Sequence, residues 1–430
     1  MKEYVRAIVV YLLTLEAKAV LRKYKPRIIA ITGSVGKTSS KDAAYAAISG
    51  HTFVRKSEKS FNSDIGVPLT VLGVPNGWGS VVQWLRNLAD GLLLLILPAP
   101  YPRWLIVEVG ADRPGDISRA LSWLQPSVVV ATRFPEVPVH VEFYNSPEAV
   151  FAEESYPLTA LGSGSCAVLN ADDERMRTLT LPDGVSTIRY GFAKDADVRA
   201  SHYRVLTARG APRGISFSIH HADERLQVSL GGAIGKVHVY ALLAGVAAAR
   251  AAAVPFSRMK DIAEAYQPSP GRLRLIKGAN DTTIIDDSYN ASPAAVEEAL
   301  NALESAPTGG RRIAVLADML ELGRYSAEEH RKAGAAAATV VDFLVTIGVR
   351  ARHIAEGAKA GGMHDSAIRS FERGEDAAVF LRAELKEGDT VLVKGSQSMR
   401  MERVVRALMK DPDDAPRLLA RQDTEWLSRP

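Results

Sequence analysis

The sequence predicts an α/β protein with two layered units: a P-loop central ATPase domain with a mixed sheet, and a C-terminal Rossmann-like doubly wound domain. Two observations predict this class. Apolar, strand-like runs alternate with helical patterns almost throughout the chain, as they do in units built around parallel sheets. The alternation breaks at QPSPGR, residues 267–272, and then restarts, because two prolines and a glycine favour a linker. We therefore expect an N-terminal helix over 1–26, the central domain over 27–267 and the C-terminal domain over 268–430.

The expected central domain opens with a short apolar run, Ile28 to Ile31, which is typical of a buried strand. Three later runs are strand-like in the same way: residues 104–111, 127–134 and 166–173. Residues 185–230 alternate instead, as antiparallel strands do, and the alanine-rich residues 236–254 indicate a buried helix. The C-terminal domain has four strand candidates separated by helical patterns: residues 282–290, 311–319, 342–349 and 389–396.

The first strand runs into Thr-Gly-Ser-Val-Gly-Lys-Thr and then into a helical pattern. Strand, glycine loop, Lys-Thr and helix together predict a phosphate cradle, because glycines let backbone N–H groups approach phosphate oxygens. Lys37 would neutralise the terminal phosphates and the Thr38 hydroxyl would bind magnesium. The loop is shorter than the usual phosphate-binding loop, because Ile31 stands where the usual spacing has its first glycine. The alternative is a glycine turn that precedes a helix by chance and binds no phosphate. The expected ATP-binding residues are Gly33, Ser34, Val35, Gly36, Lys37, Thr38 and Ser39.

Net charge and cysteine content argue against several classes of function. The 430 residues carry a net charge of +4, which is small for this length, and no aromatic-basic repeat indicates nucleic-acid binding. Cys166 is the single cysteine, so neither an internal disulfide framework nor a cysteine-rich metal site is expected. A cytoplasmic protein fits this composition best.

Two apolar segments raise the question of a membrane. The N-terminus has an apolar stretch over 7–15, then an Ala-Lys-Ala like a cleavage site, then a run of basic residues. We reject a signal peptide because the nucleotide strand follows within a few residues. Residues 78–103 are rich in Trp and Leu, and neither segment is long enough to span a bilayer. The N-terminal segment either packs on the protein body or lies on the inner face of an anionic membrane. Residues 78–103 form either a core helix or a surface hairpin that, with the N-terminal helix, meets a membrane or a lipid-linked substrate.

Several acidic residues and a histidine suit a magnesium–ATP site. Glu108 ends a strand beside the phosphate loop, the right place for a magnesium ligand. His140 follows the next strand, and Glu153 or Glu154 on the helix after it could reach the same metal. Asp286–Asp287 end a strand of the C-terminal domain, where a carboxylate could bind a ribose. The structural alternatives are a capping glutamate, a buried histidine and an Asx turn.

The sequence resembles the Mur ligases, the ATP-dependent amide ligases of bacterial cell-wall precursor synthesis. Matching stretches follow in family order from about residue 28 to residue 405 and include TGSVGKTS, SFNSDIGVPLTVL, VEVGADRPGDI, PVHVEFYNS, SPGRLRLIKG and LVKGSQSMRMERVV. DDSYNASP and ADMLELG indicate the MurF branch, which adds D-alanyl-D-alanine to a UDP-muramoyl tripeptide, rather than folate-polyglutamate ligases. The resemblance implies ATP and Mg²⁺ as cofactors, a peptide-type acceptor and a D-Ala-D-Ala-like amine as partners.

The resemblance also implies a mechanism, in which ATP phosphorylates a substrate carboxylate and an amine attacks the acyl phosphate. Lys37 and Thr38 would hold the β/γ phosphates and a first magnesium with Glu108. His140 would bind a second magnesium, and Arg272 and Asp287 would reach ATP from the C-terminal domain. The implied catalytic residues are Lys37, Glu108, His140 and Glu154, and the implied metal ligands are Thr38, Glu108, His140 and Glu154.

Three departures from the family pattern stand out. Glu154 occupies the place of the family's carbamoylated lysine, and we interpret it as a carboxylate that needs no CO₂. His238 stands where an asparagine reads adenine, and we expect it to substitute. The residues before the loop are too few for the family's UDP-binding domain, so we expect another way of holding the acceptor.

Two rivals to a monomeric MurF-like ligase stay open. The same chemistry on a lipid-linked or poly-amino-acid acceptor is one of them. The other is a nucleotide-binding regulatory subunit without catalysis, which the lysine-to-glutamate change at Glu154 favours. Phosphate release only when acceptor and amine are both supplied would exclude the second.

Overall fold

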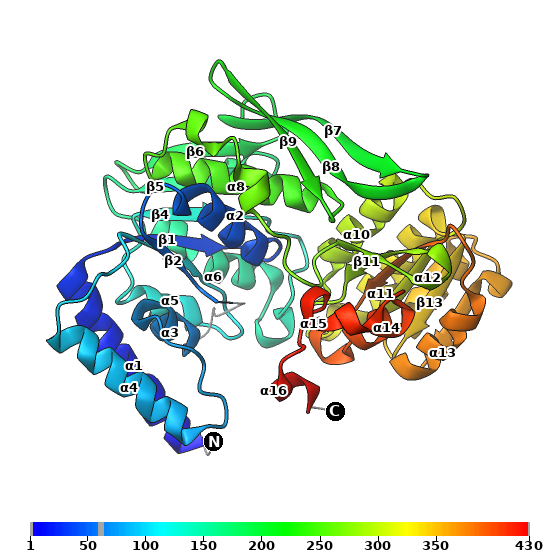
Figure 1. The fold of residues 1–430 in the computed structure, drawn as a ribbon, viewed down its shortest axis with the longest axis horizontal. Coiled ribbons are helices and arrows are strands. Elements are labelled where there is room, and N and C mark those ends of the chain that lie inside the picture. Colours follow the sequence, from blue (N-terminus) through cyan, green and yellow to red (C-terminus); the bar gives the residue numbers. More distant parts are fainter. Residues whose placement is uncertain (1–2, 59–63, 429–430) are drawn as a thin grey trace.

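Two α/β units lie side by side, with a pair of helices projecting from the first (Figure 1). The computed structural model describes residues 3–58 and 64–428. The first unit is built on a nine-stranded sheet in the order β2-β3-β1-β4-β5-β6-β7-β8-β9. The second is built on a six-stranded sheet in the order β10-β11-β15-β12-β13-β14. The α/β class with a mixed first sheet is confirmed.

The nine-stranded sheet is parallel from β2 to β7 and antiparallel from β7 to β9. The antiparallel part therefore begins later than the alternation over 185–230 predicts, because β6 still pairs parallel with β5. The strands are β1 (Arg27–Thr32), β2 (Val54–Lys56), β3 (Trp104–Glu108), β4 (Val128–Ala131), β5 (Cys166–Asn170), β6 (Ser186–Gly191), β7 (Val198–Ala208), β8 (Ala211–His221) and β9 (Glu224–Gly231).

Alternate residues of β1 serve two cores. Ile29 and Ile31 pack in the core that holds α2 and α8, whereas Ile28 and Ala30 pack in the core that holds α1 and α3. The period of two along a strand explains this division. The helices of this unit are α1 (Glu3–Tyr24), α2 (Lys37–Ser49), α3 (Gly66–Leu72), α4 (Val81–Ile96), α5 (Asp116–Leu121), α6 (Pro147–Thr159), α7 (Glu174–Thr178), α8 (Lys236–Ala251) and α9 (Ile262–Ala265).

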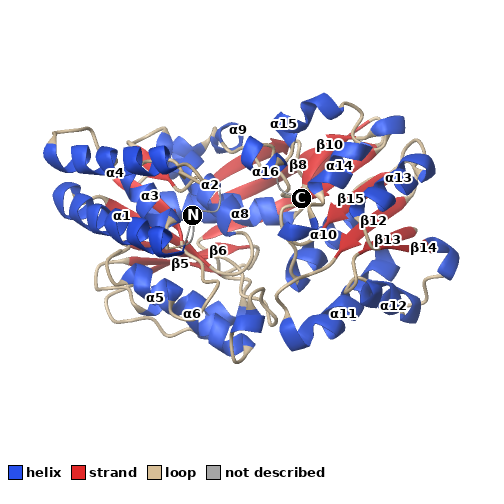
Figure 2. Cartoon of the chain, turned by 90° about the horizontal axis from the view of Figure 1, so that it is seen from below, coloured by secondary structure: helices blue, strands red, loops and turns tan. Residues whose placement is uncertain are grey.

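The six-stranded sheet contains the four predicted strands, together with β10 and β14, which sequence patterns missed. β10 is an antiparallel edge strand beside β11, and the other pairs are parallel. The strands are β10 (Arg274–Lys277), β11 (Thr283–Asp287), β12 (Arg312–Ala317), β13 (Phe343–Ile347), β14 (Ile368–Phe371) and β15 (Thr390–Lys394). The helices are α10 (Pro293–Ser305), α11 (Ser326–Val340), α12 (Arg352–Ala360), α13 (Gly374–Glu384), α14 (Glu402–Leu408), α15 (Ala415–Leu418) and α16 (Thr424–Leu427). Figure 2 shows these helices around the second sheet.

The two apolar segments form one structure. α1 and α4 run side by side at the end of the first unit, as Figures 1 and 2 both show. Of α4, only Trp84, Asn87 and Gly91 are buried, so the segment is a surface hairpin and its interpretation as a core helix is wrong. Within the described residues, no helix combines the length and hydropathy that crossing a bilayer requires. Part of the family-like stretch over 60–72, namely 60–63, lies outside the described residues.

Candidate active site

The glycine loop joins β1 to α2 as the sequence predicts. Gly33 has φ +117°, and a Cβ there would lie 2.3 Å from the Thr132 hydroxyl oxygen, so only glycine fits. The Ser34 and Val35 N–H groups donate to the Arg133 carbonyl oxygen, at 2.9 and 3.3 Å, which anchors the loop to the segment after β4. Lys37 is the first residue of α2 and donates to the Gly33 carbonyl oxygen. The loop therefore presents a helix N-terminus and an ammonium at one point, an arrangement that suits phosphate.

A cavity of about 410 Å³ opens against this loop, between the two units. Lys37, Thr38, Glu108 and His140 line it from the first unit. Arg272 and Asp287 line it from the start of the second unit. Residues that are more than a hundred positions apart in the sequence thus line the same cavity. This is expected of a ligand site that lies between two units.

Glu108 and Thr38 form the centre of the cavity's polar wall. Glu108 is the last residue of β3 and is 2% exposed. The Thr38 hydroxyl donates to its carboxylate at 3.1 Å. Among the described residues, no three His, Cys, Asp or Glu side chains are gathered as a metal cage. Mg²⁺, however, is usually held by one or two carboxylates together with substrate phosphates, and Thr38 with Glu108 fits that kind of site.

Glu154 reaches the phosphate loop from α6. Its carboxylate accepts a hydrogen bond from the Ser34 hydroxyl and lies 3.8 Å from the Lys37 ammonium. The side chain is buried, at 4% exposure. Its neighbour Glu153 instead accepts hydrogen bonds from the Gly115 and Ile117 N–H groups, at 3.1 and 2.9 Å. Of the two glutamates that the sequence left open, Glu154 is the one that contacts the phosphate loop, and its role as a metal ligand stays a prediction.

His140 is held by carboxylates of both units. Its Nδ1 lies 2.5 Å from Glu321 Oε2, and its Nε2 lies 3.6 Å from Asp112 Oδ1. The contact with His140 lowers the pKa of Glu321. A carboxylate on one ring nitrogen is typical of metal-binding histidines, but here the Asp112 carboxylate also lies near the other nitrogen. His140, Glu108 and Glu154 do not form one metal cluster among the described residues, so the expected assignment of His140 to a second magnesium, apart from Thr38 and Glu108, stays a prediction.

His238 does not face the cavity, contrary to the expectation that it reads adenine. The ring is fully buried in α8, with Nδ1 3.1 Å from the Tyr266 hydroxyl and Nε2 3.0 Å from the Arg272 carbonyl oxygen. Burial lowers its pKa to about 4, so the ring is neutral near pH 7. With both nitrogens engaged, His238 positions the backbone of Arg272 instead.

Asp286 and Asp287, the last two residues of β11, have different roles. Asp287 lines the cavity, where its carboxylate pairs with the buried Lys394 ammonium and accepts from the Leu273 N–H at 3.2 Å. Asp286 is fully buried and accepts from the Gly271 N–H at 3.1 Å, and burial raises its pKa to about 6. Asp286 is therefore structural. Burial also lowers the pKa of Lys394.

Arg272 and several residues that sequence reasoning missed complete the wall. The Arg272 guanidinium lies 4.3 Å from the centre of the Tyr289 ring, and the Arg421 guanidinium lies 4.8 Å from it. Trp78 and Trp426 also line the cavity, with ring centres 6.5 Å apart at 81°. Lys394 ends a strand in a family-like stretch, so its position carried a usable signal. Tyr289 lies in the family-like DDSYNASP, whereas Trp78 and Trp426 carried no signal of a shared site, because only the packing of the two units brings them together.

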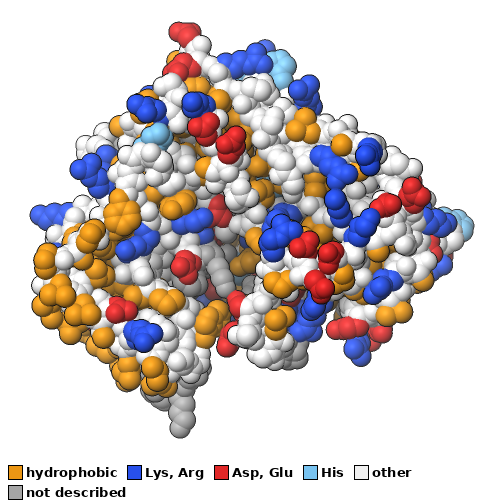
Figure 3. Space-filling view, viewed as in Figure 1, with side chains coloured by type: hydrophobic (Ala, Val, Ile, Leu, Met, Phe, Trp, Pro, Cys, Tyr) orange, Lys and Arg blue, Asp and Glu red, His pale blue; other side chains and the backbone are white. Residues whose placement is uncertain are grey.

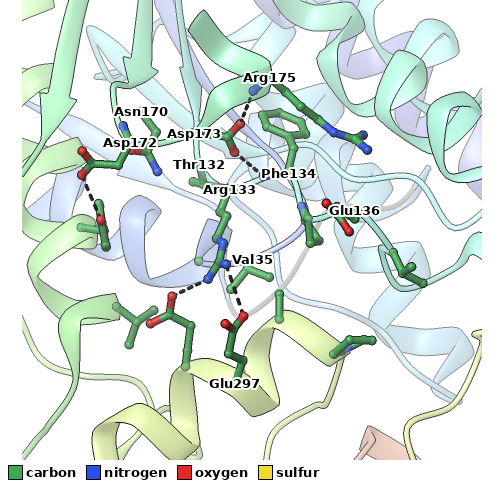
Figure 4. A pocket seen from close by; sticks show the side chains of 18 of the residues that line it. Val35, Thr132, Arg133, Phe134, Glu136, Asn170, Asp172, Asp173, Arg175 and Glu297 are labelled. Atoms are coloured by element: carbon green, nitrogen blue, oxygen red, sulfur yellow. Dashed lines mark hydrogen bonds and ion pairs between the residues drawn. The ribbon is translucent and has the colours of Figure 1, made fainter. Parts of the chain in front are cut away.

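A larger cavity, of about 840 Å³, adjoins the first and shares Val35 and Gly36 with it. Arg133 crosses its floor toward two carboxylates of α10 (Figure 4), pairing with Glu298 and lying 3.5 Å from Glu297. These pairs join the first unit to the second. The side chains of α8 above the loop, including Tyr240, line the same cavity.

The fold and the cavities define a P-loop nucleotide-binding protein whose second unit closes over the phosphate loop. The chain belongs to the Mur ligase family: residues 92–249 match the Mur ligase middle domain, and residues 271–397 match the Mur ligase glutamate ligase domain.

Two of its relatives are UDP-N-acetylmuramoyl-tripeptide–D-alanyl-D-alanine ligases. The Bacillus subtilis enzyme is 27% identical over 398 residues, covering 92% of this chain and 79% of that one. The Escherichia coli enzyme is 27% identical over 404 residues, covering 92% and 80%. The crystal structure of a MurF ligase from Thermotoga maritima in complex with ADP has a TM-score of 0.74 at 23% identity, covering 94% of this chain and 84% of that one.

Proposed function

We propose that this protein is an ATP- and Mg²⁺-dependent ligase that joins D-alanyl-D-alanine to the terminal carboxylate of a UDP-muramoyl tripeptide. One observation carries the proposal: Lys37, Thr38, Glu108 and His140 line one cavity with Arg272 from the other unit. The named activity of the two relatives supplies the substrates. The enzyme works in the cytoplasm, as a monomer.

The chemistry needs positioning and charge neutralisation rather than a protein nucleophile. A carboxylate oxygen of the acceptor attacks the γ-phosphorus of ATP, and the bond to the β-bridging oxygen breaks, giving an acyl phosphate and ADP. The amine nitrogen then attacks the acyl carbon. The tetrahedral intermediate expels inorganic phosphate, and the nitrogen loses its proton. Phosphoryl transfers of this kind are accelerated mainly by oriented charge.

Each residue of the loop has a part in that scheme. Lys37 leaves the Gly33 carbonyl oxygen to neutralise the terminal phosphates, while the loop N–H groups and the start of α2 fix their orientation. Thr38 and Glu108 would hold Mg²⁺, which would supply neutralisation of the negative charge that develops in phosphoryl transfer. Arg272 supplies a second cation from the other unit.

Glu154 and His140 act on the acceptor side of the phosphates. Glu154 places a carboxylate where the family has a carbamoylated lysine, and it orients Lys37 and Ser34 without any need for CO₂. Glu321 orients the ring of His140, and Nε2, which lies 3.6 Å from Asp112 Oδ1, would bind a cation together with that carboxylate. Because Glu321 comes from the second unit, closure of the two units sets this ring.

The adenosine part of ATP occupies the larger cavity. That cavity adjoins the loop through Val35 and Gly36 and is ample for a nucleoside at about 840 Å³. Arg133 and the α10 glutamates close its floor. Adenine recognition then relies on the residues of α8 that face this volume, among them Tyr240, and not on His238.

The experiment is a measurement of ADP and phosphate release with separately supplied substrates. UDP-muramoyl tripeptide with D-alanyl-D-alanine should give both products, and omission of either substrate should abolish phosphate release. Lipid-linked muramoyl peptides and poly-amino acids serve as competing acceptors. If the protein binds ATP but turns over none of these acceptors, the proposal is refuted and a regulatory nucleotide-binding role is favoured.

A further inference from the structure

The α1–α4 pair carries an unusual share of the exposed apolar surface. Eleven of the sixteen large apolar side chains that are exposed in the described residues lie on it. Figure 3 shows apolar side chains gathered over this end of the molecule. The members are Ile8, Tyr11, Leu12 and Leu15 on α1, and Val81, Val82, Leu85, Leu92, Leu93, Ile96 and Leu97 on or directly after α4. Concentration of this kind marks an interaction site.

Each helix has two distinct faces. On α1, Leu13 and Ala17 are fully buried against the protein, whereas Leu12 and Leu15 point outward. The exposed residues of each helix recur every three or four positions, so they form a stripe. The stripes therefore lie opposite a normal buried face and are not a consequence of loose packing.

The pair is tied together as a rigid hairpin. The Lys23 ammonium donates to the Leu94 and Leu97 carbonyl oxygens, at 2.8 and 2.7 Å, and the Tyr24 hydroxyl donates to Leu94 at 3.0 Å. These bonds satisfy the carbonyl groups that end α4. Gly91 permits the close approach of the helices, since a Cβ there would lie 2.1 Å from Glu16 Oε2. Both stripes are thus held in a fixed relation.

Basic residues border the apolar stripes. Arg22 continues the α1 stripe seven residues after Leu15, and Arg86 lies on the exposed side of α4. Residues 6–27 and 81–97 contain seven Lys and Arg but only two acids, Glu16 and Asp90; of the seven, Lys23 is bonded to the end of α4 and Arg6 pairs with Asp64 at 3.3 Å. An apolar stripe with a cationic border suits an anionic lipid surface, where tails accept the apolar side chains and headgroups accept the cations.

We propose that the α1–α4 hairpin docks this protein on the surface of an anionic lipid bilayer. The described helices do not cross a bilayer, so the contact is peripheral. A second copy of the chain is a poorer occupant, because a two-fold contact would bring the same cationic border to itself. The hairpin also leads into the cleft: Trp78, which lines the smaller cavity, comes three residues before α4 begins. Docking would hold the mouth of that cavity near the lipid headgroups.

The test is flotation of the full-length protein with vesicles. The wild type should float with mixed phosphatidylglycerol–phosphatidylcholine vesicles, less well at high salt, and poorly with phosphatidylcholine alone. Arg22→Glu with Arg86→Glu should lower the partition coefficient at least 25-fold, since each basic residue near an anionic surface contributes about fivefold. Leu92→Ser with Ile96→Ser should also abolish flotation.

Matched changes far from the hairpin serve as controls. Val349→Ser with Val379→Ser removes two exposed apolar side chains, and Arg382→Glu with Arg406→Glu reverses two exposed cations; both should float as the wild type does. Thermal unfolding checks that every variant is folded. Failure of the wild type to float with anionic vesicles overturns the proposal. So does a dimer by light scattering that Leu92→Ser with Ile96→Ser converts to a monomer.

Discussion

Glu154 offers the sharpest test of the proposed chemistry. Its carboxylate is buried, accepts a hydrogen bond from Ser34 and lies 3.8 Å from the Lys37 ammonium. Glu154→Ala removes this charge beside the phosphate loop. Glu154→Gln keeps the shape and removes only the charge.

The expected loss follows from the position. A buried group that orients the charges around a transferring phosphoryl group typically accounts for about 10²–10³ in rate, or about 2.7–4 kcal/mol. Both variants should lose that much in kcat/KM, and the loss should lie mostly in kcat if Glu154 acts in the transition state. The ATP affinity should change little, because Lys37 still reaches the phosphates. Coupled ADP release measures the rate, and equilibrium nucleotide binding provides the control.

Glu154→Lys separates a replacement for carbamoyl-lysine from a merely structural glutamate. The lysine amine can attack CO₂, form an N–C bond and lose a proton, which regenerates a carboxylate at the end of a longer stem. Added bicarbonate should therefore raise the activity of Glu154→Lys well above that of Glu154→Ala, whereas the wild type should not respond. If bicarbonate leaves Glu154→Lys no more active than Glu154→Ala, the replacement account is wrong.

Three further predictions concern the loop, the histidine and the hairpin. Lys37→Ala should abolish turnover in the ADP-release assay while thermal unfolding stays near that of the wild type. Glu321→Gln should lower activity about 10- to 100-fold by freeing the ring of His140, and should shift the pH–rate profile; an unchanged profile would contradict that role. Burial raises the pKa of Glu16 to about 7, above its usual 4.5, so the folded state keeps this proton longer than the unfolded chain does. Protonated Glu16 therefore stabilises the folded state fully below the unfolded pKa of 4.5, and this contribution to the free energy of unfolding is lost as the pH rises through about 7. Glu16→Gln should therefore melt near the wild type at about pH 5 and above it at about pH 8, as calorimetry would show.

Much of the fold could be predicted because it rests on local patterns. Several parallel strands, including β1, β3, β4 and β13, are short and largely apolar runs, and the linker over 267–272 combines prolines with glycine. β10 and β14 could not be found in this way. They are four-residue edge strands with exposed positions, and what makes them strands is pairing with a neighbour already in place.

The site was predictable where chemistry sits in a motif, and not where it depends on packing. Gly33 to Ser39 and Glu108 lie where strand, loop and helix must place them. His238 was misjudged because sequence alignment fixes a position on α8 but not which way its ring faces. Glu321 was missed as a partner of His140 because the two belong to different units.

Contacts between the two units hold several residues of the site in place. Three groups of the first unit have a counterpart in the linker or in the second unit. Glu321 holds His140, Glu298 pairs with Arg133, and the Ser269 hydroxyl donates to Asp42 at 2.8 Å. These polar contacts accompany apolar packing between the units, because one buried cluster contains residues of both α8 and α10. In the proposed ligase, closure of the units over ATP and acceptor would set this geometry. Catalysis would thus depend on the closed state, in which the second unit both supplies Arg272 and sets the ring of His140.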